Sequence, residues 1–255
     1  MLPGITLKEL LRKLTEQNKM KRDYLAEATD IRFVDRDEME NGEAEGRAYN
    51  QLTIKGLDNT AFDINGNCHR QIASRLDIPW KYYDRMAKEL PELLQDNVNH
   101  WLRASEDRRM VRTLDGTARA FLSDRYKLLD HIDLAEAVLP TLYDVRDMEI
   151  VSCEVTEDRM YIKALFPRMK AEITVGDVVQ SGIVISNSEV GNGALKVEHL
   201  IYRLSCTNGM ISTDNSTCRN HVGRNVESQF GEMYREETLK QDDKAFWMKI
   251  QDTVK

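Results

Sequence analysis

The sequence lacks several features that would place it in a specialised class of protein. The 255-residue chain has only four cysteines and five prolines, and no apolar run approaches the roughly 20 residues that cross a bilayer. The N-terminus has no apolar core of a secretory signal, and the cysteines form no CxxC pair. Thiols spread in this way are expected to stay reduced in a cytoplasm. We therefore expect a soluble, cytoplasmic protein without a membrane partner.

The sequence also lacks the short motifs of common nucleotide-binding and hydrolytic enzymes. It contains no GxSxG, P-loop or GxGxxG, each of which builds a specific turn around a nucleophile or a phosphate. Cys206, Cys218 and His221 offer one tight pair, whereas structural zinc normally shows two. Asp130 and Asp133 would suit a two-metal site, but acidic residues at this spacing also favour a helix N-terminus. We therefore predict no catalytic residue, metal or cofactor, and an enzyme is the less favoured interpretation.

The composition is that of a polar globular protein. Hydrophobic residues make up 41% of the chain and charged residues 31%, with a formal net charge of −7. This balance is unlike that of a disordered chain. A negative net charge does not indicate a nucleic-acid-binding protein. It does not exclude one either, because such binding needs only a local positive surface.

The N-terminal part of the chain is expected to be mostly helical. Leucines at helical spacing predict a helix over 5–28. A short strand is expected at 48–57 and a turn at 58–67. Residues 68–104 read as consecutive helices, two of which begin at a proline.

From about residue 109, apolar and polar residues alternate with a period of two. This alternation predicts strands around a turn at Asp115 and Gly116, then around 156–158, with a helix at 131–144 between the two pairs. Two further strands are expected to meet at a type I′ turn formed by Asn192 and Gly193, and Asn208-Gly209 is a second turn signal. The fold class is α+β: a helical N-terminal third followed by an antiparallel β-meander sheet packed with helices. We expect three regions: 1–105, mostly helical with a short strand; 106–230, the antiparallel core; and 231–255, a C-terminal helix.

Three blocks of the sequence, at residues 71–86, 112–140 and 186–210, resemble the phage/plasmid-like protein family, whose core is a domain of unknown function. The blocks follow the family's order, and the resemblance runs from the first helix to about residue 221. It implies a bacterial host cell and a role in mobile-element DNA metabolism or in conflict with a host. A looser similarity, at the level of fold alone, links the strand–hairpin–strand core to single-strand annealing proteins.

Residues 101–127 form the best candidate for a nucleic-acid surface. Seven basic residues stand against four acidic ones here, so the segment carries +3. Phosphates need cationic donors, and unpaired bases stack on aromatic rings. With Tyr126 as the stacking residue, the predicted binding residues are Arg109, Arg112, Arg119, Arg125, Tyr126, Lys127 and, from a second basic group, Arg203. The alternative for this segment is a solvated hairpin held by ion pairs.

Residues 70–86 faintly resemble a helix-turn-helix. Ala73 lies where a small residue is needed, and Asp77 lies at the turn, where glycine is more usual. Trp80, Tyr82 and Tyr83 are unusual for reading base edges, which favours Arg, Asn and Gln. A plain helical hairpin is the preferred interpretation of this segment.

The leading functional hypothesis is a non-enzymatic mobile-element protein that binds nucleic acid, with single-stranded DNA favoured over duplex. Annealing or strand protection in recombination or replication would be its task, and annealing proteins commonly assemble into homo-oligomers. A second hypothesis is an interaction factor that binds a host protein or its own copies, which the acidic loop at 35–46 would suit. A third is a metal-dependent nuclease.

Overall fold

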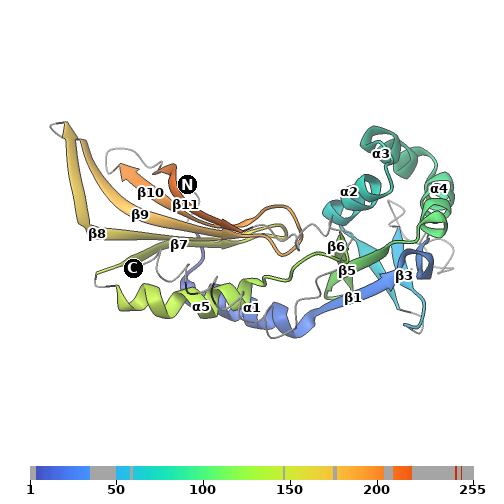
Figure 1. The fold of residues 1–255 in the computed structure, drawn as a ribbon, viewed down its shortest axis with the longest axis horizontal. Helices are drawn as coiled ribbons and strands as arrows, with labels where there is room; N and C mark the ends of the chain where they lie inside the picture. Colours follow the sequence, from blue (N-terminus) through green and yellow to red (C-terminus); the bar gives the residue numbers. More distant parts are fainter. Residues whose placement is uncertain are drawn as a thin grey trace, which may run out of the picture. The chain divides into compact units, whose positions relative to one another are not determined.

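The computed structural model of the protein describes residues 4–34, 50–57, 60–145, 147–174, 177–203, 209–219, 245 and 248. The chain divides into two compact units (Figure 1). The central unit is residues 19–126, and the terminal unit combines residues 1–18 with 127–255. The boundaries between the units, at 18/19 and 126/127, differ from the boundaries of the three regions expected from the sequence. None of the helices in the described ranges is long and apolar enough to cross a membrane.

The central unit is built on a six-stranded sheet of order β1-β5-β6-β4-β3-β2. Neighbouring strands are antiparallel except β4 and β6, which pair in parallel and make the sheet mixed. A 3-10 turn, η1 (Ala28–Asp30), separates the first two strands in the chain. The strands are β1 (Lys21–Glu27), β2 (Ile31–Val34), β3 (Gln51–Ile54), β4 (Ala61–Ile64), β5 (Arg108–Leu114) and β6 (Thr117–Ser123).

Three helices cover one face of this sheet: α2 (Gly66–Arg75), α3 (Trp80–Glu89) and α4 (Pro91–Ala104) (Figure 1). Phe33, Leu52 and Phe121 of the sheet share one buried cluster with Tyr83 of α3 and Val98 of α4. This cluster is the core of the central unit.

The terminal unit is a five-stranded antiparallel meander of order β11-β10-β9-β8-β7. Its helices α1 (Leu7–Met20) and α5 (His131–Asp144) lie along one face of the sheet (Figure 1). Leu10 and Leu14 of α1 and Val138 of α5 pack with Ile162 and Ile185 of the sheet. The strands are β7 (Glu149–Val155), β8 (Met160–Thr174), β9 (Asp177–Asn187), β10 (Leu195–Arg203) and β11 (Gly209–Arg219).

The α+β class is confirmed, as are the helices at 68–104 and 131–144 and the meander. The turn at Asp115 and Gly116 is also confirmed: both residues have positive φ, +49° and +76°. Such left-handed pairs are what a type I′ hairpin requires.

Three local predictions were wrong, and the N-terminal third holds more strand than expected. The helix predicted over 5–28 ends at Met20, and Lys21–Glu27 forms β1, with its inward positions alternating. The turn predicted at 58–67 contains β4, because Phe62 and Ile64 are buried in the core. Between β9 and β10, Gly191 takes the left-handed conformation at φ +79°, and Asn192 and Gly193 do not form the turn.

Other predictions fall on residues that the structure does not describe. Asn208 of the second turn signal and the acidic loop at 35–46 lie outside the described residues, as does the C-terminal helix at 231–255 apart from 245 and 248.

Candidate nucleic-acid interface

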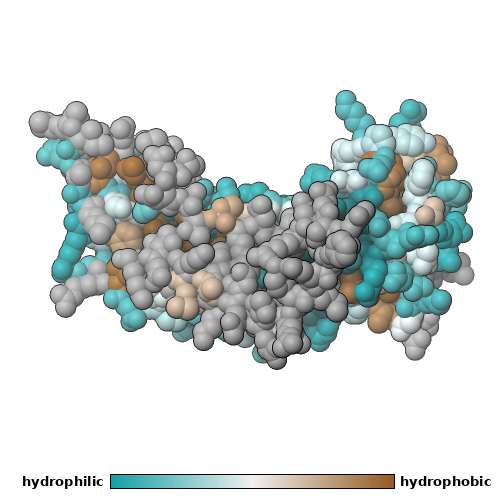
Figure 2. All heavy atoms as spheres, in the orientation of Figure 1, coloured by the Kyte–Doolittle hydropathy of each residue, from teal (hydrophilic) through white to brown (hydrophobic). Residues whose placement is uncertain are grey.

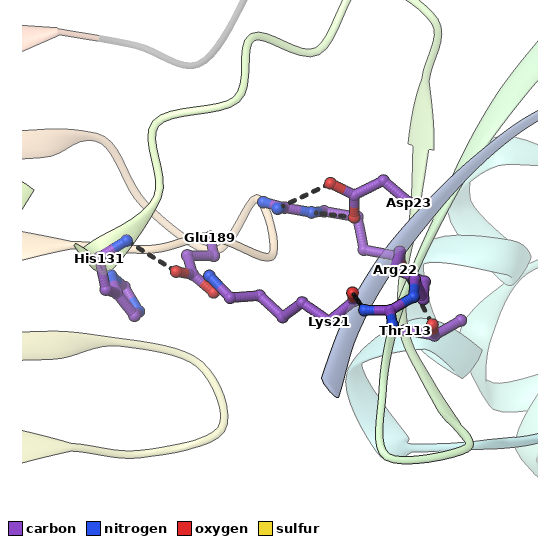
Figure 3. A network of polar contacts seen from close by, with 7 residues as sticks. Lys21, Arg22, Asp23, Thr113, His131 and Glu189 are labelled. Atoms are coloured by element: carbon purple, nitrogen blue, oxygen red, sulfur yellow. Dashed lines mark hydrogen bonds and ion pairs between the residues drawn. The ribbon is translucent and has the colours of Figure 1, made fainter. Parts of the chain in front are cut away.

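Arg112, the central residue of the predicted basic surface, is completely buried. It lies on β5 directly opposite Asp23 of β1. Its guanidinium donates two hydrogen bonds to that carboxylate, at 2.8 Å from Nε to Oδ1 and 3.0 Å from Nη2 to Oδ2; Figure 3 shows both bonds at Asp23. In the same view the guanidinium of Arg22 lies beside Thr113, whose hydroxyl donates to the Arg22 carbonyl at 3.1 Å. The charge of Arg112 is therefore engaged within the sheet.

Arg109 and Arg119 are also buried. Arg109 Nη2 lies 2.6 Å from Asp107 Oδ2, and its guanidinium carbon is 6.0 Å from the centroid of the Phe121 ring. A buried arginine that already has an ion pair and an aromatic contact must leave both to reach a phosphate. We therefore do not place these side chains in the candidate interface.

The other four predicted residues lie at different levels of exposure. Arg125 is exposed, and Tyr126 and Lys127 are half-buried. Arg203 is the last residue of β10, opposite Val179 of β9, and its side chain lies outside what the structure describes. For these residues the binding role stays a prediction.

A buried polar cluster in the terminal unit explains the polar end of β9. The Glu189 carboxylate accepts the backbone N–H of His131 at 2.7 Å (Figure 3). Asn187 donates to the Leu129 carbonyl at 2.8 Å and lies 3.1 Å from His131 Nδ1. His131 is the first residue of α5, so a distant carboxylate caps this helix where the dipole favours negative charge.

Asp130 and Asp133 themselves lie at the N-terminus of α5, as the N-cap residue and a first-turn residue. This is the helix-terminus interpretation given in the sequence analysis. Across the described ranges, no group of three or more His, Cys, Asp or Glu side chains is placed to hold a metal ion.

The helices α2 and α3 are joined by a short turn. Four residues separate them, and Asp77 takes the left-handed conformation at φ +54° in the turn where a glycine is more usual. Ala73 is buried, and its carbonyl accepts the N–H of Ile78 at 2.8 Å. Five apolar residues of α2, the turn and α3 are buried in the core of the central unit: Ile72, Leu76, Ile78, Tyr83 and Met86.

Polar contacts hold the two helices on the sheet and to each other. The Phe121 N–H of β6 donates to Gln71 Oε1 at 2.7 Å, and Asn65 caps α2 by accepting the Cys68 N–H at 2.9 Å. Between the helices, the Tyr83 hydroxyl lies 2.8 Å from His69 Nδ1. These contacts hold α2 and α3 together as one platform on the sheet.

Burial sets the protonation states of this contact. Desolvation lowers the pKa of His69 to about 4, so its ring is neutral at pH 7 and Nδ1 accepts the bond. Desolvation also raises the pKa of the Tyr83 phenol, which stays protonated and donates. The pKa of the Cys68 thiol is raised by burial as well, so this cysteine is an inert core residue.

The outer surface of α3 carries large aromatic side chains. Trp80 is 41% exposed and Tyr82 is 47% exposed. The Trp80 indole stacks on Tyr83 with centroids 5.6 Å apart and an interplanar angle of 18°, and the Arg70 guanidinium lies 5.7 Å from the indole centroid. Figure 2 shows hydrophobic atoms among hydrophilic ones over these helices.

Basic side chains surround the aromatic ones. Arg70, Arg75 and Lys81 are exposed. Segment 66–89 contains five basic and three acidic residues, which leaves +2 in a chain of net charge −7. Two of the bases, Arg85 and Lys88, form i,i+4 ion pairs with acids of α3 at 2.8 Å and 2.6 Å. The remaining cations lie on α2 and at the start of α3, beside the exposed rings.

The sequence pointed to this segment without identifying it as the interface. The sequence features that indicate this two-helix surface are the spacing of the apolar positions in α2 and α3 and the small residue Ala73.

Comparison with known proteins gives a family but no activity. No match was found among curated proteins or among solved structures. The model of one family, described as a domain of unknown function (DUF932), matches residues 119–247. That match covers a little over half of the 255 residues, and the chain belongs to the DUF932 family.

Proposed function

We propose that this protein binds nucleic acid through the outer surface of α2 and α3, with single-stranded DNA as the preferred form. The observation that carries the proposal is the exposure of Trp80 and Tyr82 beside Arg70 and Lys81 on the platform of α2 and α3. Cations neutralise phosphates, and aromatic rings stack on bases.

The aromatic side chains favour single strands over duplex. The faces of bases are available for stacking only when the strand is unpaired. Two of the long polar side chains on α3, Arg85 and Lys88, are ion-paired along the helix. Bidentate contacts to base edges would have to break those pairs first.

A second candidate is duplex binding, which the resemblance of α2 and α3 to a helix-turn-helix favours. In proteins with this motif the second helix enters the major groove. The left-handed turn residue Asp77 and buried Ala73 support that resemblance. The two candidates use the same surface and differ in the form of nucleic acid.

We further propose the biological setting that the sequence resemblance suggests: a phage, plasmid or integrated element acting in the cytoplasm of a bacterial cell. Strand protection or annealing during recombination or replication would use single-strand binding directly.

The proposal is tested by fluorescence polarisation with a labelled oligo-dT and a labelled duplex at two salt concentrations. Tyr82→Ser with Lys81→Ser should weaken binding to the single strand, because it removes one stacking ring and one cation. Stacking contributes about 1–3 kcal/mol per base, so the affinity should fall about 5-fold to 150-fold.

Arg32→Ser is the matched control. Arg32 is exposed on β2 between Ile31 and Phe33, which face the helix-covered core, so it points to the other face of the sheet. Its loss should leave the affinity close to that of the unaltered protein. Binding that favours duplex would select the second candidate, and equal effects of the two variants would contradict this interface.

A further inference from the structure

Helix α4 has an exposed apolar stripe besides the face that it buries. Leu94, Val98 and Leu102 are buried against the core. On another side, Leu93 is 41% exposed and Trp101 is 50% exposed. These two are eight residues apart, so they lie on the same side of the helix.

The stripe continues beyond the helix and has a polar centre. Leu90, immediately before α4, is 56% exposed. Asn97, midway between Leu93 and Trp101, is half-buried. Scattered exposed apolar residues are normal, but a contiguous row of large ones on one element marks an interaction site.

Charged residues flank the stripe on one side only. Glu92, Asp96 and Arg103 are all exposed, and their helical positions fall within about 40° of each other at 100° per residue. The acids lie toward the N-terminal end of α4 and the arginine at its C-terminal end. Within the part of the chain that the structure describes, none of the three forms an ion pair. The Arg103 Nε donates only to the Asn99 carbonyl of its own helix, at 3.0 Å.

We propose that α4 is the contact surface of a homodimer, in which a second copy of this chain docks its own α4 antiparallel along the stripe. A two-fold axis at Asn97 places Leu93 of each copy opposite Trp101 of the other. The same axis brings Glu92 of each copy beside Arg103 of the other, at both ends of the contact. Because the charged flank of one antiparallel helix meets the same flank of its partner, Glu92 and Arg103 are complementary at both ends of the contact, while Asp96 of each copy lies near the axis.

The charge order selects the antiparallel arrangement. A parallel pair would set the charged flank of each helix against the uncharged flank of its partner, so Glu92 and Arg103 would not meet. Two-fold contacts of one surface with itself are the commonest form of oligomer. A single polar Asn at the centre of such a stripe fixes the register of paired helices.

Sedimentation equilibrium of the whole chain over a range of concentrations tests the proposal. A monomer–dimer equilibrium is expected, and Leu93→Ser with Trp101→Ser should leave a monomer. Glu92→Lys or Arg103→Glu alone should each raise the dissociation constant about tenfold, because each reversal sets like charges together at both ends. Glu92→Lys combined with Arg103→Glu should restore the dimer.

The charge reversals are surface changes that leave the core intact, so the rescue distinguishes a lost contact from misfolding. A monomer at every concentration would overturn the proposal. So would a dimer that neither the serine pair nor the single reversals weaken. The test is independent of nucleic-acid binding, because no residue altered in it belongs to the surface of α2 and α3.

Discussion

His69 is the side chain whose protonation state matters most to the proposed interface. Its neutral ring contributes no charge to the surface. Instead, its neutral ring accepts the Tyr83 hydroxyl and makes edge contacts with Phe33 and Tyr83 at centroid distances of 6.1 Å and 5.8 Å. The ring thereby joins α2, α3 and β2. Protonation of His69 would place a charge in this aromatic cluster and remove the acceptor.

The stability of the central unit should therefore depend on pH through His69. Burial lowers its pKa from an ordinary 6.5 to about 4, so the unfolded chain takes up the proton first as pH falls. The contribution to stability is complete above pH 6.5 and is lost as pH falls toward 4. At about 1.4 kcal/mol per pKa unit, the loss approaches about 3 kcal/mol.

Urea unfolding at pH 7 and pH 5 measures this effect. His69→Gln should flatten the difference between the two pH values, while His100→Gln, at an exposed position of α4, should leave it unchanged. An unaltered pH dependence in His69→Gln would show that another group is responsible.

At the scale of elements, the ion pair between buried Arg112 and the more exposed Asp23 joins β1 to β5. These strands pair in register over their whole length, with Asp23 opposite Arg112. Asp23→Ala leaves a fully buried guanidinium without this partner. Because Asp23 is partly exposed, this loss should cost about 1–3 kcal/mol, measurable as a drop in the free energy of unfolding.

Asp30→Ala is the matched control for this prediction. Asp30, the last residue of η1, forms an ion pair with Lys55, which follows β3, at 3.5 Å and with both side chains well exposed, at 38% and 82%. Exposed pairs contribute about 0–1 kcal/mol. A similar loss in both variants would contradict the structural role assigned to Arg112.

Some of the elements that local pattern predicts are confirmed by the structure, and others are not. The helices from 68 to 104 and the strands around Asp115 and Gly116 follow directly from spacing and turn residues. Strand β1 was missed because residues 21–27 follow a leucine-rich helix without a glycine or proline to mark the end. Tyr24 and Ala26 alternate toward the core, but this pattern identifies a strand only once β1 is seen paired with β5.

The candidate interface was less predictable, for a related physical reason. The arginines of β5 and β6 look like a basic surface in the sequence, but Arg112 meets a carboxylate 89 residues away. Burial by a distant partner leaves no local signal. The α2–α3 platform is local in sequence, and its spacing was visible, but the exposure of Trp80 and Tyr82 depends on how α3 packs.

At the scale of the whole molecule, the central unit supplies both proposed surfaces. Its sheet and core hold α2 and α3 for nucleic acid and leave one side of α4 open for a second copy of the chain. A dimer would present two nucleic-acid surfaces at once, which strengthens binding to a long strand by raising the effective concentration of the second site.

The most direct test of the account is the fluorescence of Trp80 during titration with oligo-dT. The chain has three tryptophans, so Trp101→Phe with Trp247→Phe leaves Trp80 as the sole reporter. Bases that stack on α3 should quench its emission saturably, with less quenching by duplex and reversal on adding salt. Binding detected by polarisation without any change in Trp80 emission would contradict the claim that α3 holds the bases.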